Sequence, residues 1–462
     1  MHDRPRTTTL LVGALALLSS PVGAQQEAPV RPPNIVVLFA DDAGYADFGF
    51  QPGADPALAR CTPRITALAA EGARFSDAYM SGAVCSPSRA GLLTGRYQQR
   101  FGHEKNIPPG YMEGGMDLAE RTMADRLSAL DLATGLVGKW HLGYPAEYHP
   151  NRRGFGWFHG LLQGSRGYAP MPNASAHRVI QENGKALPET GWVTDRFGEA
   201  AARFVAEHRD EPFFLFVSFT APHGPLQPSP EDRAAVQGIE NERRAQYAGL
   251  VVGLDRAVGR VLDALDAHGL ADRTLVVFTN DNGGQTQTGA VNDPLRGRKG
   301  QLWEGGIRVP MAMRWPSRIE PGRVVSDPVS ALDLMPTFLS ACGATAPDGA
   351  ALDGVDLVPL VTGAVDRLPD RALFWRTHGG AGPVAVRMGR HKLVVERGPE
   401  GTTDHLFDLE TDIGEQENLA ADGGERVATL RAAIAAWEAD LVEPPWGTEG
   451  TTFPVRSRPG SA

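Results

Sequence analysis

Residues 34–42 read NIVVLFADD, an apolar run of strand length that stops at two acidic side chains. The run shows no alternation of polar and apolar residues, so both faces of the strand it predicts should be covered. Strands of that kind belong to parallel sheets with helices on either side. This stretch therefore predicts an α/β fold in which residues 34–40 form a central strand.

Other segments support the same architecture. Three more apolar runs, 134–138, 213–219 and 275–279, have the character of buried strands. Helical signals alternate with them. Thr62-Pro63 predicts a helix start, with Thr62 as the cap, and residues 247–265 carry an apolar stripe of period 3.6. We predict a large mixed, mostly parallel sheet sandwiched by helices.

The composition of the sequence changes near residue 340. Short apolar segments and glycines follow, and a last helical pattern covers about 425–440. At 462 residues the chain is long for one core, so a second, smaller unit is expected. We predict a flexible leader over 25–33, a main domain over 34–340, a C-terminal α+β subdomain over 341–448 and a loose tail over 449–462.

The first 24 residues have the pattern of a secretory signal peptide. Arg4 and Arg6 give a basic start, an apolar run covers 10–18, and small residues at 22–24 suit cleavage. The apolar run is about half of the roughly 20 residues needed to span a bilayer. We therefore predict export to the periplasm or the medium without a membrane anchor.

Charge and cysteine content exclude some functions. The net charge is −10 and the pI about 5.7, with no basic stripe for nucleic acid. An anionic substrate would need positive charge concentrated locally. The three cysteines are an odd number for an exported chain, which indicates an unpaired thiol. Cys61 and Cys342 could form a disulfide or could be two ordinary small buried residues.

Polar side chains follow each predicted strand. Asp41-Asp42 ends the first, Lys139 and His141 follow the second, His223 follows the third, and Asp281-Asn282 follows the fourth. Each motif alone is commonplace as a turn, a cap or a solvated loop. Their repetition at the strand ends favours a single site, because ligands bind at the carboxyl ends of strands in open α/β sheets.

Cys85-Ser86-Pro87-Ser88-Arg89 is the most distinctive segment. Pro87 suits a first helical turn, so Cys85 should lie at or just before a helix N-terminus, where anions are favoured. An ordinary thiol with a lowered pKa would fit this position. A cysteine nucleophile would also fit, although it usually needs a histidine base nearby.

The longer segment 85–96, CSPSRAGLLTGR, resembles the signature of the formylglycine-dependent (type I) sulfatases of the alkaline phosphatase superfamily. Further motifs resemble that family in the family's order, and the resemblance spans residues 34 to about 420. It implies an alkaline-phosphatase-like fold with 34–340 as the catalytic domain. These further motifs are Asp41-Asp42, GKWHLG at 138–143, APH at 221–223, DNG at 281–283, GRKG at 297–300 and LFDL at 406–409.

The resemblance implies that a formylglycine-generating enzyme oxidises Cys85 to an aldehyde, which hydrates to a gem-diol. It also implies one Ca²⁺ held by Asp41, Asp42, Asp281 and Asn282 together with an oxygen of the modified Cys85. Carboxylate and amide oxygens suit a hard cation of this type rather than zinc.

Roles for the remaining residues follow from the same resemblance. A gem-diol hydroxyl attacks sulfur while Lys139 and Lys299 hold the sulfate charge, and Arg89 binds the gem-diol. His223 protonates the leaving oxygen with help from Lys299. His141 then removes the proton of the second hydroxyl, so that the aldehyde re-forms and sulfate leaves.

The resemblance implies a sulfated carbohydrate as the substrate. Candidate specificity residues lie in loops near the motifs, although each could equally be a solvated or capping residue: His103, Arg152, Arg166 and His378. Two alternatives stay open. One is a formylglycine-dependent phosphodiesterase or phosphonate monoester hydrolase, and the other is a non-catalytic protein that binds sulfated glycans. The sequence does not indicate which sugar is bound or the oligomeric state.

Overall fold

The computed structural model describes residues 1–2, 8, 31–345 and 351–446. The predicted signal peptide, most of the leader and the predicted tail lie outside the described residues. The chain divides into two units, Met1–Arg31 and Pro32–Ala462, and all the elements below belong to the second. No helix in the described ranges is both long and apolar enough to cross a membrane.

Strand β1 (Asn34–Ala40) lies in the middle of the main sheet, and all seven of its residues are buried. It pairs in parallel with β8 (Phe213–Ser218) on one side and with β9 (Thr274–Asn280) on the other. Leu38, for example, lies opposite Val217 and Phe278. The prediction of a doubly covered central strand is confirmed.

The main sheet has ten strands in the described residues. The four predicted strands are all present with ends moved by at most one residue. In spatial order the strands are β11 (Arg323–Val325), β2 (Ala73–Phe75), β10 (Met311–Arg314), β9, β1, β8, β4 (Ala133–Lys139), β5 (Trp157–Leu161), β6 (Gln181–Glu182) and β7 (Lys185–Ala186). The five central ones, β9, β1, β8, β4 and β5, are parallel, and β10 and β6, which flank them, run the other way.

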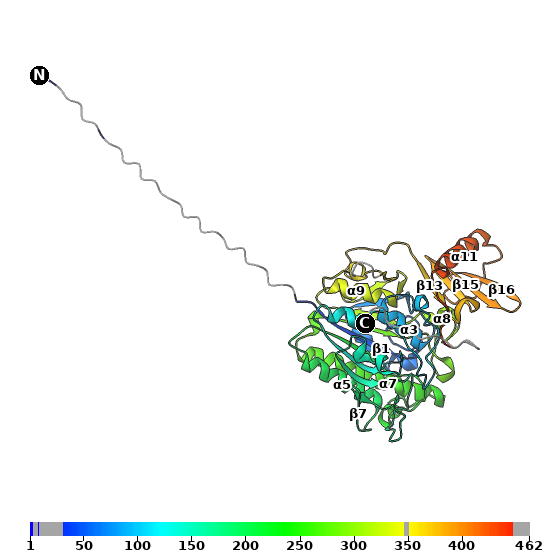
Figure 1. Cartoon of the computed structure of the whole chain (residues 1–462), viewed down its shortest axis with the longest axis horizontal. Coiled ribbons are helices and arrows are strands. Elements are labelled where there is room, and N and C mark those ends of the chain that lie inside the picture. The colour runs from blue at the N-terminus through cyan, green and yellow to red at the C-terminus, as the bar shows by residue number, and fades with distance from the viewer. Residues whose placement is uncertain (3–7, 9–30, 346–350, 447–462) are drawn as a thin grey trace, which may run out of the picture. The chain divides into compact units, whose positions relative to one another are not determined.

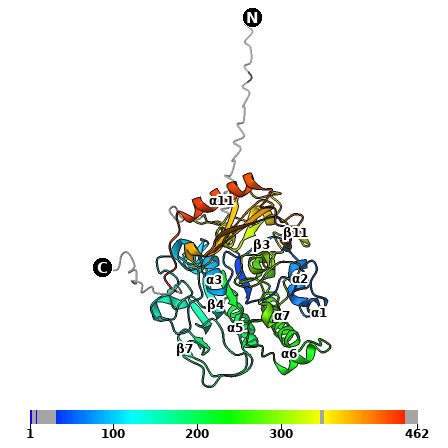
Figure 2. The same cartoon turned by 90° about the vertical axis from the view of Figure 1, so that its right-hand side faces the viewer.

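Helices cover both faces of this sheet (Figures 1 and 2). Ile35, Val37 and Phe39 point to the face covered by α3 (Cys85–Thr94), α4 (Met123–Ser128) and α9 (Leu334–Ala341). The alternate residues of β1 point to the face covered by α2 (Pro63–Ala70), α5 (Val193–Glu207) and α7 (Glu242–Ala267). Each face has its own apolar core, as the sandwich prediction requires.

The predicted stripe of α7 is buried, and α2 begins with Pro63 directly after Thr62 as its cap residue, as predicted. Thr62 makes no capping hydrogen bond, because its hydroxyl accepts instead from Gly49 N at 2.9 Å. The carboxylate of Asp255, which reaches over from α7, accepts from Arg64 N at 3.1 Å and Ile65 N at 2.8 Å. A tertiary contact has replaced the local one.

The C-terminal region forms a separate antiparallel sheet of β13 (Ala372–Arg376), β14 (Val384–Met388), β15 (His391–Gly398) and β16 (Gly401–Asp408). Helix α11 (Gly424–Glu438) packs on it, at the top of Figure 2. The α+β character of this region agrees with the prediction. The remaining elements are α1 (Pro56–Ala59), β3 (Ala78–Tyr79), α6 (Pro230–Ala235), α8 (Glu304–Ile307), β12 (Val329–Ser330) and α10 (Val358–Val361).

All three cysteines carry free thiols. Cys61 packs in a small cluster beside α7, whereas Cys342 packs against the core under α9. The interpretation of these two as ordinary small residues is confirmed, and their pairing in a disulfide is not.

Candidate active site

The predicted site residues meet at one edge of the main sheet, because β9, β1, β8 and β4 are neighbours in that order. Asp41-Asp42 and Asp281-Asn282 follow two adjacent strands directly. His141 comes two residues after β4, and His223 lies five residues after β8. Parallel strands end at the same edge, so four distant parts of the sequence become one cluster.

Cys85 is the first residue of α3 and is buried at the centre of this cluster. Its Sγ lies 3.5 Å from Asp41 Oδ1 and 3.9 Å from Asp42 Oδ1. Lys299, from the loop before α8, brings its Nζ to 3.2 Å from the same sulfur. Burial raises the pKa of the Cys85 thiol, and the nearby Asp281 adds to the rise. The interpretation of Cys85 as a thiol with a lowered pKa is therefore wrong.

Each buried carboxylate has its own cation. Lys139 Nζ donates to Asp41 Oδ2 at 2.6 Å, and Lys299 Nζ donates to Asp42 Oδ2 at 2.7 Å. Arg89, from the second turn of α3, donates to Asp281 Oδ2 at 3.0 Å. Three carboxylates and three cationic side chains thus form three ion pairs near the sulfur.

Arg89 is held on its other side by Ser218, the last residue of β8, whose hydroxyl it contacts directly. Ser218 in turn donates to Lys139 O at 2.7 Å. The sequence analysis did not single out Ser218. The available signal was a polar residue at the end of the apolar run Phe213–Ser218, the same signal that pointed to the aspartates.

The acidic side chains carry unequal pKa shifts. Burial and the neighbouring Asp281 raise the pKa of Asp41. Burial also opposes ionisation of Asp42 and Asp281, but nearby cations outweigh it and lower both pKa values: Lys299 at Asp42 and Arg89 at Asp281. The carboxylates are thus crowded together and depend on positive charge to stay ionised.

The side chain of Asn282 indicates a cation site. The side-chain nitrogen of Asn282 donates to Asp42 Oδ1 at 2.8 Å, while its Oδ1 is buried without any hydrogen-bond partner. Ligand atoms of Asp41, Asp42, Cys85 and His223 all lie within 4.8 Å of one another. An orphaned carbonyl oxygen beside ionised carboxylates fits a hard divalent cation.

Asp281 lies at the side of this group rather than inside it. Its Oδ1 accepts from the backbone N–H of Asp42 at 3.1 Å, and its Oδ2 accepts from Arg89. His223, which the sequence analysis placed outside the cation set, lies in the group instead. The predicted ligand set and the cluster therefore share Asp41, Asp42 and Cys85.

The two histidines differ in their surroundings. His223 keeps 23% of its side chain exposed, and its Nε2 lies 3.5 Å from Asp42 Oδ2. His141 is buried, and burial together with Lys139 and Arg89 holds its pKa well below the ordinary value. Its Nδ1 has no partner. A neutral imidazole in that position can accept a proton.

Two residues at this edge have a strained backbone. Asp42 and His141 have φ of 68° and 61°, in the left-handed region that side chains other than glycine rarely adopt. Gly164 backs onto the His141 ring so closely that a Cβ there would lie 2.5 Å from Nε2. Such strain persists where the surroundings hold a side chain in a required direction.

The four candidate specificity residues separate into two kinds. His103 and Arg166 are buried and already paired, the first with the Ser86 hydroxyl at 2.6 Å and the second with Glu189 at 2.6 Å. Arg152 and His378 are exposed. None of the four is among the residues around Cys85 described above.

The sequence also matches models of known protein families. The family model described as Sulfatase matches residues 33–344, more than half of the chain. The chain belongs to the sulfatase family. A second model, described as N-sulphoglucosamine sulphohydrolase, C-terminal, matches residues 298–436 of this sulfatase.

Curated relatives cover most of the sulfatase. Arylsulfatase A of Homo sapiens is 36% identical over 90% of this chain and 88% of its own length. Steryl-sulfatase of Mus musculus is 31% identical over 94% and 86%. N-acetylgalactosamine-6-sulfatase of Canis lupus familiaris is 32% identical over 82% and 74%. The protein is a sulfuric ester hydrolase.

Solved structures agree on the fold. Ps i-CgsB, in a crystal structure with k-i-k-neocarrahexaose, has a TM-score of 0.85 and 35% identity over 91% of this sulfatase and 96% of that chain. The phosphonate monoester hydrolase of Agrobacterium radiobacter has a TM-score of 0.64 and 21% identity over 88% and 95%, which shows a shared fold alone. The alkaline-phosphatase-like fold is confirmed.

Proposed function

We propose that this sulfatase hydrolyses a sulfate ester on a carbohydrate, using formylglycine made from Cys85 and one bound Ca²⁺. A single observation carries the proposal. Cys85, buried at the start of α3, faces Asp41 and Asp42 on one side and Lys299 on the other, with Asn282 Oδ1 left unpaired nearby. The nucleophile position, a cation site and the positive charge needed for a sulfate thus coincide.

The aldehyde is proposed because the reaction needs two hydroxyls on one carbon. In its hydrated form one hydroxyl can attack sulfur, and the other can lose a proton so that sulfate is released and the aldehyde returns. A thiol or a serine hydroxyl has no second hydroxyl and would stay sulfated. A formylglycine-generating enzyme must act on the chain before this chemistry is possible.

Asp41, Asp42, Asp281 and Asn282 would hold the Ca²⁺ together with an oxygen of the modified Cys85. When bound, the ion supplies positive charge that stabilises an ionised oxygen at neutral pH. Lys139 and Lys299 add two more charges at the same place, where they can neutralise the sulfate oxygens as charge develops. Arg89, clamped by Asp281 and Ser218, would hold the gem-diol in one orientation.

His223 is the proposed acid because it is the partly exposed histidine of the pair, so it can meet a leaving group that extends toward solvent. His141 is the proposed base for the release step. It is buried and neutral, and Gly164 fixes its ring from behind. The two roles separate proton delivery from proton removal.

The carbohydrate part of the proposal is supported by the relatives. N-acetylgalactosamine-6-sulfatase bears a sugar in its name, and Ps i-CgsB was crystallised with an oligosaccharide. Steryl-sulfatase and arylsulfatase A act, by name, on other sulfate esters, so substrate class must be tested directly. Export, proposed from residues 1–24, places such a substrate within reach.

The test is mass spectrometry of the peptide that contains Cys85, purified from cells with a formylglycine-generating enzyme. We expect the aldehyde in place of the thiol, and an unmodified thiol in fully active protein would contradict the mechanism. A panel of sulfated saccharides, an aryl sulfate, a phosphate diester and a phosphonate monoester then tests the reaction. Faster turnover of the phosphorus esters would favour the alternative hydrolase, and binding without turnover would favour the non-catalytic protein.

A further inference from the structure

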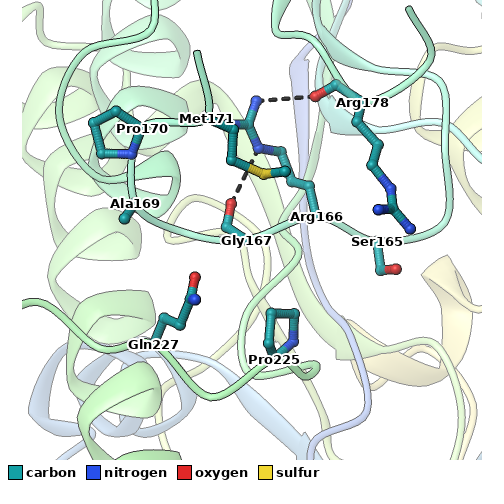
Figure 3. A pocket seen from close by; sticks show the side chains of 9 residues that line it. All are labelled: Ser165, Arg166, Gly167, Ala169, Pro170, Met171, Arg178, Pro225 and Gln227. Atoms are coloured by element: carbon teal, nitrogen blue, oxygen red, sulfur yellow. Dashed lines mark hydrogen bonds between the residues drawn. The ribbon is translucent and has the colours of Figure 1, made fainter. Parts of the chain in front are cut away.

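A cavity of about 310 Å³ is lined by segments that continue from the proposed site along the chain (Figure 3). Its walls come from two segments, Ser165–Met171 and Pro225–Gln227, and from Arg178. Both segments continue directly from the histidine region. Gly164, which backs onto His141, precedes Ser165, and Pro225 comes two residues after His223.

The cavity is tied to the loop that carries the proposed acid. The Tyr168 hydroxyl lies 2.7 Å from both Thr220 O and His223 O, so the wall segment and the His223 loop share this hydroxyl. Tyr168 N also donates to the side chain of Gln227 at 3.1 Å, which links the two wall segments. Because His223 is the proposed acid for the leaving oxygen, we infer that this cavity lies on the leaving-group side of the substrate.

Two guanidinium groups line the cavity, and they are not equivalent. Arg166 is neutralised by Glu189, with donor distances of 3.1 and 2.6 Å, and it also donates to the backbone of Gly167 and Arg178. Arg178 has no carboxylate within ion-pair distance in the described part of the chain. Its side-chain nitrogens lie 3.2 Å from the amide oxygen of Gln163, with that amide in its hydrogen-bonded orientation.

Arg178 therefore brings an uncompensated charge to a cavity wall. Its side chain is partly exposed and extends toward Ser165 in Figure 3. The protein as a whole carries a charge of −10, so an anionic ligand is repelled except where positive charge is concentrated. Met171, Pro170 and Pro225 add apolar surface of the kind that packs against a sugar ring.

We propose that this cavity binds a second anionic substituent, a sulfate or a carboxylate, on the leaving-group side of the substrate, with Arg178 as the residue that recognises it. Guanidinium groups bind such oxyanions through two parallel hydrogen bonds. The inference rests on the proposed function and sharpens it, because the substrate becomes an oligosaccharide that carries at least two negative groups. Ser165 and Gln227 offer further polar contacts.

The experiment measures binding without turnover, in protein with Cys85→Ala. Three disaccharides that share one backbone are titrated by calorimetry. They are a monosulfated form, a form with one more sulfate on the leaving sugar, and a form with one carboxylate there. We expect the second anion to tighten binding about tenfold, or roughly 1.4 kcal/mol. Sulfate and carboxylate arms then show which anion is preferred.

Arg178→Ala should remove that tenfold advantage and leave the Kd of the monosulfated form within about twofold, while Arg178→Lys should keep part of it. Arg152→Ala, which removes an exposed arginine from a different cavity, is the matched control and should change neither. Equal binding of all three disaccharides, no binding of any, or an advantage that survives Arg178→Ala overturns the inference. Failure of the proposed function would appear separately, as lack of 4-nitrophenyl sulfate turnover by protein that retains Cys85.

Discussion

Two clusters of charged side chains are buried in this sulfatase, and they differ in one respect. The first surrounds Cys85 at the edge of the main sheet. The second lies where the C-terminal sheet meets the main domain, around Lys392 of β15. Lys139 and Lys392 are both fully buried, and each donates to a buried carboxylate at 2.6 to 2.8 Å. Burial and ion pairing alone do not distinguish the two places.

The junction cluster is complete. Lys392 Nζ lies 2.8 Å from Glu304 Oε1 and 2.8 Å from Glu415 Oε1. The second oxygen of Glu304 accepts from the Tyr79 hydroxyl at 2.6 Å, and that of Glu415 accepts from Glu304 N at 2.7 Å. Burial opposes ionisation of Glu304, but Lys392 and Arg308 lower its pKa to about 2. Every carboxylate oxygen has a partner.

The cluster around Cys85 is incomplete. Asn282 Oδ1, His141 Nδ1 and Arg89 Nε are all buried without a hydrogen-bond partner. Leaving such atoms unpaired costs roughly 1–3 kcal/mol each, unless a bound molecule supplies the partner. Of these two clusters, the one around Cys85 is therefore distinguished by its missing partners and not by its buried charge.

The largest expected effect is on turnover and concerns the cluster around Cys85. Cys85→Ala should lower turnover by about 10⁶-fold, or roughly 8 kcal/mol of barrier, because it removes the nucleophile. The fold should persist, since only a small side chain is lost at the start of α3. Turnover of an aryl sulfate and the Tm report the two quantities. Turnover within about tenfold of the unchanged protein contradicts the nucleophile assignment.

The second prediction is on stability and concerns the junction cluster around Lys392. Lys392→Met should lower the free energy of unfolding by about 3–5 kcal/mol, because Glu415 loses its buried cation and Glu304 keeps only its pairing with Arg308. Urea unfolding measures the loss. Arg390→Met, which removes an exposed arginine two residues away with surface partners, is the control and should change the free energy of unfolding very little. A loss that small for Lys392→Met would show that the junction cluster is not needed for stability.

The third prediction separates the two histidines. His223→Ala should lower kcat/KM for a sugar sulfate by about 10³-fold, roughly 4 kcal/mol, because a sugar alkoxide needs a proton in order to leave. The loss for 4-nitrophenyl sulfate should be much smaller, since nitrophenolate leaves without a proton. His141→Ala should slow both substrates toward a common rate. Equal losses with His223→Ala would move the acid role to Lys299.

The smallest expected effect is the stabilisation of the protein by Ca²⁺, which should depend on the cluster around Cys85 and not on the junction cluster. Saturating Ca²⁺ should stabilise the protein by about 2.7 kcal/mol at a hundredfold excess over Kd, seen as a rise in Tm. Asp281→Ala should lose most of this rise, whereas Lys392→Met should keep it, because the junction offers no unpaired oxygen. Fully active protein that contains zinc or no metal contradicts the calcium site.

Much of this could be predicted from the sequence because the decisive signals are local. The run Asn34–Ala40 is apolar throughout, and the strand ends mark the site by their polar residues. The resemblance to sulfatases then supplied roles that patterns alone left open. The acceptor for the first N–H groups of α2 could not be predicted, because Asp255 lies 190 residues from Ile65 in the sequence.

Contacts across the sheet were hidden for the same reason. The contact of Ser218 with the site depends on the pairing of β8 with β4. In the sequence Lys392 resembles an ordinary strand lysine, and its pairing with Glu304 follows from the tertiary structure. The fold class follows from how each segment looks on its own. The completeness of a buried cluster depends on several segments at once.

The junction cluster also bears on how sulfatases can be recombined. Glu304 lies in the main domain, five residues after Lys299, while Lys392 and Glu415 belong to the C-terminal region. A chimera joined near residue 340 would inherit the two halves of this cluster from different parents. A crossover before residue 298, where the C-terminal family model begins, would carry the loop of Lys299 together with its support. The unit of exchange is therefore larger than the C-terminal sheet itself.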